Sequence, residues 1–225
     1  MKTMLKQFKK ATCMFLMGTL VIGMTQSAAL KGEVTQAANK NDAALKAYRE
    51  LMTDSEKAEK VTGYIGSGLE ECEFALIDLN KDGTKEMVFT SDAGYHTSIL
   101  AYVNGKVKCV GGGFAGDQKY YPNKHLYYSL TAHTGDMIYT YYKFTGKKMK
   151  AVAEKHGWDY MNMVTGEQKT GDEVATYAPY KYTVKGKTVS KKKYQAYVKK
   201  LKKGAKSAKL KWHKNTKSNR TKYLN

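Results

Sequence analysis

The sequence predicts an α+β fold, an antiparallel β-meander of about eight strands with one N-terminal helix and two C-terminal helices. Three observations support this prediction. Short runs rich in Tyr, Val and Thr follow one another through residues 97–188, and the chain holds only two prolines. Several of these runs end in a two-residue turn with Gly second, the spacing of β-hairpins. Amphipathic helical patterns flank this region on both sides.

Residues 1–29 have the layout of a cleaved secretory signal peptide. Four lysines precede an apolar run from Ala11 to Met24, and small residues end at Ala29. The apolar run is too short to favour a stable membrane span, although an uncleaved signal anchor is the alternative. Cleavage after Ala29, or after Ala37, would leave a chain without a transmembrane segment. We therefore expect a protein that is secreted or associated with the cell wall.

Removal of the signal leaves one domain, residues 30–225, which is long enough for a single buried core. Residues 30–40 are expected to form a flexible linker. The segment Asn41–Met52 follows, with Ala44, Leu45, Tyr48 and Leu51 at helical spacing after an Asx N-cap. This pattern predicts one amphipathic helix that packs against a sheet.

The segment Phe74–Phe89 combines two strand-like runs with a tight acidic loop. Side-chain oxygens stand at loop positions 1, 3, 5 and 9, with Gly83 at position 6, where a sharp turn needs a positive φ. Calcium accepts six to eight such oxygens and relieves the repulsion between the carboxylates. A polar hairpin turn without metal is the alternative. The predicted ligands are Asp78, Asn80, Asp82, the backbone carbonyl of Thr84, and Glu86.

Position 12 of the count is Phe89, where an EF-hand has a bidentate Glu, so Glu86 has to be a direct ligand. In this form the segment resembles the calcium loops of FG-GAP and VCBS-type repeats and, more loosely, the dockerin loop. The whole chain is similar to small secreted proteins of Gram-positive bacteria that carry one such loop. The resemblance implies a structural Ca²⁺ and a place outside the cell. The chain has no second copy of the motif, unlike repeats arranged in a propeller.

Five turns carry Gly at the second position: Asn104-Gly105, Thr134-Gly135, Thr145-Gly146, Thr165-Gly166 and Lys185-Gly186. The first of them is the strongest type I′ hairpin signal. Two cysteines remain after signal cleavage, Cys72 and Cys109. Export permits a disulfide between them, and two separate thiols are the alternative.

The positive charge is concentrated in residues 181–225, which hold sixteen lysines, Arg220 and no acid. Residues 30–180 carry 18 basic and 20 acidic residues. Ser190 is a predicted N-cap for a helix that docks through Tyr194, Val198 and Leu201. A strand-like stretch, Ala208–Trp212, and a short helix capped at Asn215-Thr216 follow. The predicted polyanion-binding residues on the outer face of the first helix are Lys191, Lys192, Lys199, Lys202 and Lys203.

The sequence favours a binding or surface-association module over an enzyme. The five histidines are scattered without a pair at metal-ligand spacing, and no nucleophile motif stands in the right context. The expected partners are an anionic cell-wall polymer, an acidic glycan or an anionic membrane surface, and export argues against nucleic acid. Two alternatives stay open: lysines that only keep the domain soluble, and a secreted hydrolase acting on glycans or the wall, with unidentified catalytic residues.

Overall fold

The computed structural model describes residues 38–91, 95–114, 117–133, 136–158, 160–161, 168–169 and 180–225. The chain divides into two units, residues 1–40 and 41–225, and both sheets belong to the second. The predicted signal peptide, residues 30–37 of the predicted linker, and the turns Thr134-Gly135 and Thr165-Gly166 lie outside the described residues. Residues 38–40, also predicted as linker, are helical.

In the described part of the chain, eleven strands form two antiparallel sheets, which confirms the predicted α+β class with a β-rich body; this is more than the eight or so strands that were expected. The first sheet has the order β13-β1-β2-β3-β4 and the second has the order β12-β11-β8-β7-β6-β5. The first sheet consists of β1 (Glu73–Ile77), β2 (Glu86–Ser91), β3 (His96–Val103), β4 (Lys106–Phe114) and β13 (His213–Lys214). The second consists of β5 (Gln118–Tyr121), β6 (Leu126–His133), β7 (Asp136–Phe144), β8 (Met149–Trp158), β11 (Lys181–Val184) and β12 (Lys187–Thr188). A separate pair joins β9 (Tyr160–Met161) and β10 (Gln168–Lys169).

Among the described residues, four helices accompany the sheets: residues 38–51, of which 41–51 belong to the second unit and are called helix 41–51, α2 (Ser55–Thr62), α3 (Lys191–Lys202) and α4 (Lys217–Tyr223). The predicted N-terminal helix and both C-terminal helices are therefore present. The Ser190 side chain accepts a hydrogen bond from the Lys193 amide, as expected of an N-cap. Helix α2 was not predicted; Asp54 caps its start and Gly63, at a φ of +81°, ends it.

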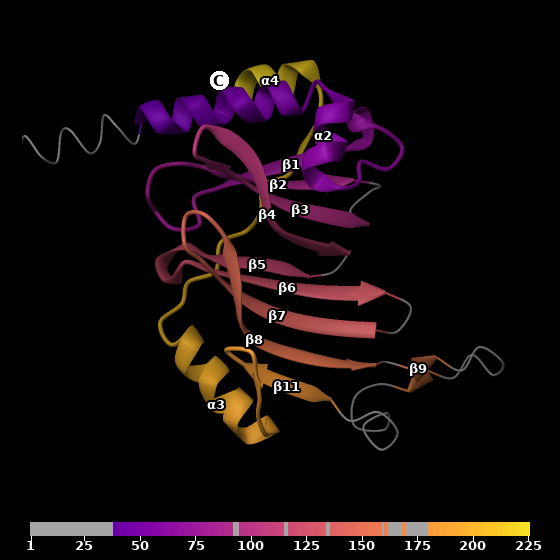
Figure 1. Ribbon diagram of the computed structural model, residues 1–225, viewed down its shortest axis with the longest axis vertical. Helices are drawn as coiled ribbons and strands as arrows, with labels where there is room; N and C mark the ends of the chain where they lie inside the picture. Colours follow the sequence, from indigo (N-terminus) through magenta and orange to yellow (C-terminus); the bar gives the residue numbers. More distant parts are fainter. Residues whose placement is uncertain are drawn as a thin grey trace, which may run out of the picture. The chain divides into compact units, whose positions relative to one another are not determined.

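The sheets and helices are packed around three clusters of buried side chains. Helix 41–51, α2 and α4 cover one face of the first sheet, where Tyr48, Phe74 and Leu224 are fully buried. The opposite face of that sheet packs against the second sheet, for example through Ile77 and Tyr127. Helix α3 covers the other face of the second sheet (Figure 1). A central strand such as β2, whose six residues are all buried, thus buries side chains on both of its faces.

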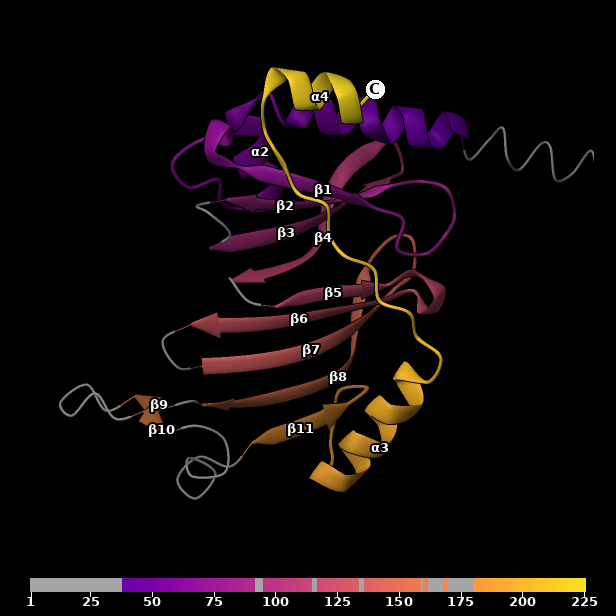
Figure 2. The same cartoon turned by 180° about the vertical axis from the view of Figure 1, so that it is seen from behind.

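The C-terminal segment returns across the unit from the second sheet to the first (Figure 2). After α3, residues 203–214, called the strap here, run extended past β5 and end in β13, which pairs with β1. The predicted strand Ala208–Trp212 is wrong: Ala208 makes only an isolated bridge to Tyr120, and ladder pairing starts at His213. Helix α4 then lies beside helix 41–51.

Two further predictions concern the two-residue turns and the cysteines. Asn104 and Gly105 have φ angles of 53° and 77°, so the predicted type I′ turn between β3 and β4 is confirmed. Lys185 and Gly186 repeat this pattern between β11 and β12, at 51° and 76°. Cys72 is buried and Cys109 is exposed, and no disulfide joins them. Of the two alternatives for the cysteines, the structure has the unbridged one.

Candidate metal centre

The predicted calcium loop connects β1 to β2 and contains two residues in the left-handed region. Lys81 has a φ of 59° and Gly83 a φ of 83°. Gly adopts this conformation without steric cost, whereas a residue with a side chain does so at an energetic penalty. The chain therefore makes the sharp turn that the position of Gly83 predicted.

The carboxylates of the loop point inward and accept hydrogen bonds from its own amides. Asp78 Oδ2 accepts from the Gly83 N–H at 3.2 Å, and Asp82 Oδ1 accepts from the Thr84 N–H at 2.8 Å. Asp82 Oδ2 also accepts from the side-chain amide of Asn80 at 2.9 Å. These bonds hold the side chains of positions 1, 3 and 5 around one turn of backbone.

Two buried oxygens of the loop have no hydrogen-bond partner among the described residues. They are Asp78 Oδ1 and the hydroxyl oxygen of Thr84, a residue that is 3% exposed. A buried polar atom without a partner costs free energy, and such atoms are uncommon in folded proteins. Their presence in a loop with three carboxylates, Asp78, Asp82 and Glu86, indicates that the loop has oxygen ligands to offer to a cation. The unsatisfied group of Thr84 is the hydroxyl, whereas the sequence predicted a role for its carbonyl.

Glu86, at the start of β2, is the most unusual carboxylate of the loop. Its side chain is buried, and Oε2 accepts a hydrogen bond from the Leu79 N–H at 2.9 Å. Burial, and then the charges of Asp82 and Asp78, raise the pKa of Glu86 to about 8, although the hydrogen bond from Leu79 acts in the opposite direction. When no cation is bound, the ionised form of Glu86 is therefore unfavourable next to the other two acids.

The loop lies where three parts of the unit meet. The hydroxyl of Tyr48, on helix 41–51, is 3.0 Å from the carbonyl oxygen of Lys85 and 3.3 Å from that of Leu100. The Lys85 N–H donates to the side chain of Asn41 at 3.0 Å. On the other side, a Cβ at Gly146, in the turn between β7 and β8, would lie 3.4 Å from Asn80 Nδ2. A cation in the loop would therefore stiffen a junction between the helix and both sheets.

All five predicted ligands belong to this one loop, but they do not form a closed coordination shell. Within the described ranges, no three side chains of His, Cys, Asp or Glu are gathered around a common point suited to a metal ion. The charges of Asp78 and Asp82 raise the pKa of Glu86. Each of the three carboxylates, however, accepts its hydrogen bond from a different backbone N–H group. Binding of a cation would require these side chains to turn toward it.

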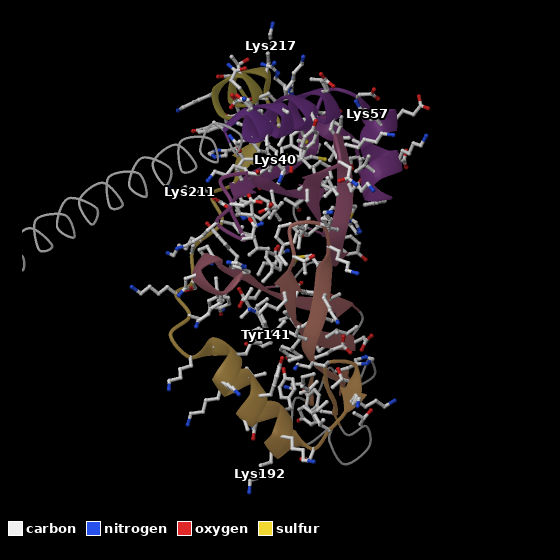
Figure 3. The ribbon with its side chains drawn as sticks, turned by 60° about the vertical axis from the view of Figure 1, so that its left-hand side comes forward. Lys40, Lys57, Tyr141, Lys192, Lys211 and Lys217 are labelled. Atoms are coloured by element: carbon white, nitrogen blue, oxygen red, sulfur yellow. The ribbon has the colours of Figure 1, made fainter. Side chains whose placement is uncertain are left out.

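The five predicted polyanion-binding lysines lie on α3 or directly after it, and all are exposed. Tyr194 is buried, and Tyr197, Val198 and Leu201 pack against the same cluster of the second sheet. Figure 3 shows Lys192 pointing away from that sheet. Among the described side chains, no ion pair involves Lys192, Lys199, Lys202 or Lys203.

The structure also contains an open cleft that the sequence did not predict, with a volume of about 700 Å³. It lies between the strap and the first sheet, and its lining includes Glu73, Asp117 and Trp212. These residues are far apart in the sequence, and none of them belongs to a recognisable motif. The one local signal is Trp212, a large aromatic residue next to Lys211 in a lysine-rich segment.

The comparisons with known proteins add no assignment. No protein-family model, no curated protein and no solved structure matches the chain. The helices of the described part of the chain include none that is both long and apolar enough to span a membrane.

Proposed function

We propose that the unit 41–225 is a calcium-stabilised module that binds extracellular polyanions through the lysine face of α3. This face consists of Lys191, Lys192, Lys199, Lys202 and Lys203. The proposal includes the export predicted from residues 1–29, so the partners are an anionic wall polymer, an acidic glycan or an anionic membrane surface. Calcium has a structural role in it, and the lysines make the contacts with the partner.

The single observation that carries the binding function is how α3 is docked. Its apolar side chains, with Tyr194 at the centre, pack on the second sheet, while the lysines face outward. Residues 181–225 contain no acid that could neutralise them. At a Debye length of about 8 Å, neighbouring ammonium groups on one helix still act together on a polymer of phosphates or carboxylates. Binding of this kind depends strongly on salt and weakly on the identity of the polymer.

The support for calcium is the pair of buried, unpartnered oxygens on Asp78 and Thr84, together with the charge crowding at Glu86. Asp78, Asn80, Asp82, Thr84 and Glu86 would hold the ion. Calcium is a hard cation that takes six to eight oxygen ligands in a flexible geometry, which suits a loop of carboxylates, an amide and a hydroxyl. Bound calcium would satisfy the unpartnered oxygens and offset the repulsion between the acids.

The polyanion test measures the salt concentration at which the protein elutes from immobilised teichoic acid or heparin. We expect a variant with the five face lysines changed to Gln to elute at markedly lower sodium chloride than the wild type. The matched control changes five exposed lysines elsewhere to Gln, removing the same charge: Lys60, Lys106, Lys108, Lys147 and Lys150. Equal elution of the two variants would show that only the total charge matters, and it would reject the lysine face of α3 as the binding site.

The calcium test compares thermal unfolding with calcium and with a chelator. Calcium at ten times its Kd should stabilise the fold by about 1.4 kcal/mol. Asp78→Ala and Asp82→Ala should abolish this stabilisation, whereas Asp42→Ala, which removes an exposed acid outside the loop, should leave it unchanged. Identical melting curves of the wild type in both conditions would exclude the metal site and leave the lysine face to be judged separately.

A further inference from the structure

The open cleft beneath the strap is separate from the calcium loop and from the lysine face. Its floor is a cross-strand row on the first sheet: Glu73 pairs with Thr90, and Thr90 pairs with Thr97. Side chains of directly paired residues lie on the same face of a sheet, so these three polar groups face the cleft together. Gln118, at the start of β5, adds an amide to the lining.

The polar groups of the cleft are held in place by their neighbours. Gln118 Nε2 donates to the Thr97 hydroxyl at 2.8 Å, and the Tyr127 hydroxyl donates to Gln118 Oε1. The strap is fixed near its middle, where the Ala208 N–H donates to the Tyr120 carbonyl at 2.9 Å, and at its end, where Lys214 pairs with Glu73. The cleft is therefore formed in advance, which reduces the entropy cost of binding a ligand.

The charges that line the cleft balance one another. Two acids, Glu73 and Asp117, stand with two lysines, Lys119 and Lys209. Asp117 forms an ion pair with Lys119, whereas Glu73 has no hydrogen bond or ion pair from a side chain of the described residues. This environment does not favour a polyanion, in contrast to α3. It favours an uncharged ligand that carries many hydrogen-bonding groups.

Trp212 supplies the apolar part of the cleft. It is one of three large hydrophobic residues of the described chain that stay exposed, at 37%. An indole ring offers a broad apolar face and one N–H donor, and it suits ligands that are apolar on one side and polar at the edge. Pyranose rings have this character, since their C–H groups form a face and their hydroxyls surround it.

We propose that this cleft binds a neutral sugar chain, with one ring stacked on Trp212. The hydroxyls of the sugar would donate to the carboxylates of Glu73 and Asp117 and exchange hydrogen bonds with Gln118. Few, well-placed polar groups beside an aromatic surface are the usual composition of a small-ligand site. The inference does not depend on the proposed polyanion binding, because the residues of the cleft and those of the lysine face do not overlap.

The experiment titrates the protein with three uncharged tetrasaccharides, built of β-1,4-linked glucose, xylose or N-acetylglucosamine, by calorimetry. We expect at least one to bind, and Trp212→Ala to weaken its binding about tenfold or more. Glu73→Gln should weaken binding less, because an amide still accepts a hydrogen bond. The matched control is Tyr64→Ala, which removes an aromatic side chain that is 40% exposed and does not line the cleft.

The variant with five face lysines changed to Gln should bind the tetrasaccharide as the wild type does. Melting curves establish that each variant is folded. Three results would overturn the proposal. They are no binding of any of the three tetrasaccharides, equal binding by Trp212→Ala and the wild type, or competition between heparin and the sugar for the cleft. Each of these results leaves the test of α3 unaffected.

Discussion

The side-chain amide of Asn215 donates a hydrogen bond to the main-chain carbonyl of Met52 at 3.0 Å, across 163 residues of sequence. The same amide group donates to the carbonyl oxygen of Leu69 at 2.7 Å, and the Asn215 N–H donates to that of Cys72 at 2.9 Å. Arg220, on α4, in turn donates to Asn215 Oδ1 at 2.8 Å. One buried Asn therefore attaches the end of the strap to the N-terminal helices and to the first sheet.

Replacement of Asn215 by Ala should destabilise the unit by about 1–3 kcal/mol, because it leaves buried carbonyl groups without their donor. Urea unfolding of both proteins measures the difference in the free energy of unfolding. Asn219→Ala is the control, since Asn219 makes one exposed side-chain hydrogen bond to Lys214 and should cost clearly less. Equal effects of the two substitutions would contradict the anchoring role of Asn215.

The parts of the fold that sequence reasoning predicted are those with local signals. The strand-loop-strand unit around Gly83, the Asn104-Gly105 turn and the cap at Ser190 each depend on residues within one short segment. Helix α2 was missed because it buries only Ala58 and Thr62, so it lacks an apolar stripe. Its cap, Asp54, was a signal that could have indicated it.

Long-range features could not be predicted for a different reason. The pairing of β1 with β13 involves two residues on the short strand, too few for any periodicity. Asn215 was expected to share the cap of the last helix, but Thr216 alone caps it, and Asn215 bonds to residues more than a hundred positions away. The cleft also depends on long-range contacts, because its lining comes from five segments spread over residues 73–212 of the sequence. The candidate calcium loop could be proposed from the sequence because its predicted ligands all lie within nine residues.

Gly157→Ala should destabilise the second sheet, because the ring of Tyr180 lies directly over this glycine. A Cβ at position 157 would stand 1.8 Å from Tyr180 Cδ1, so the ring would have to leave its place above β8. The expected loss is about 1–3 kcal/mol, as for other overpacked sites. Adding Tyr180→Ala should suppress most of the loss attributable to Gly157→Ala. Simple additivity in a double-mutant cycle would contradict the contact.

The two cysteines should differ in reactivity by a wide margin. Cys109 is exposed, whereas Cys72 is fully buried and its thiol donates to the Gly68 carbonyl at 3.2 Å. In a Cys13→Ser variant, Ellman's reagent should titrate one thiol in the native protein and a second after addition of guanidinium. Detection of no thiol in guanidinium without reductant would mean that Cys72 and Cys109 form a disulfide and would contradict this prediction.

Calcium binding should release a proton, and Glu86 is the expected source. Burial and the neighbouring acids raise its pKa to about 8, so at pH 7 the carboxyl is mostly protonated in the fold without metal. In the absence of calcium, the unfolded chain loses this proton first, near the ordinary pKa of a Glu. The free energy of unfolding therefore falls as the pH rises from that value through about 8.

Calcium reverses this preference, because the ion binds the ionised carboxylate. The apparent affinity for calcium should rise with pH, approaching about tenfold per pH unit below the pKa of Glu86 and levelling off above it. Calorimetry at pH 7 in buffers of different ionisation enthalpy measures the released proton directly. In Glu86→Gln, which keeps an oxygen ligand but cannot ionise, both the proton release and the pH dependence from this group should disappear. If the variant and the wild type release the same number of protons, Glu86 is not the residue that couples calcium to pH.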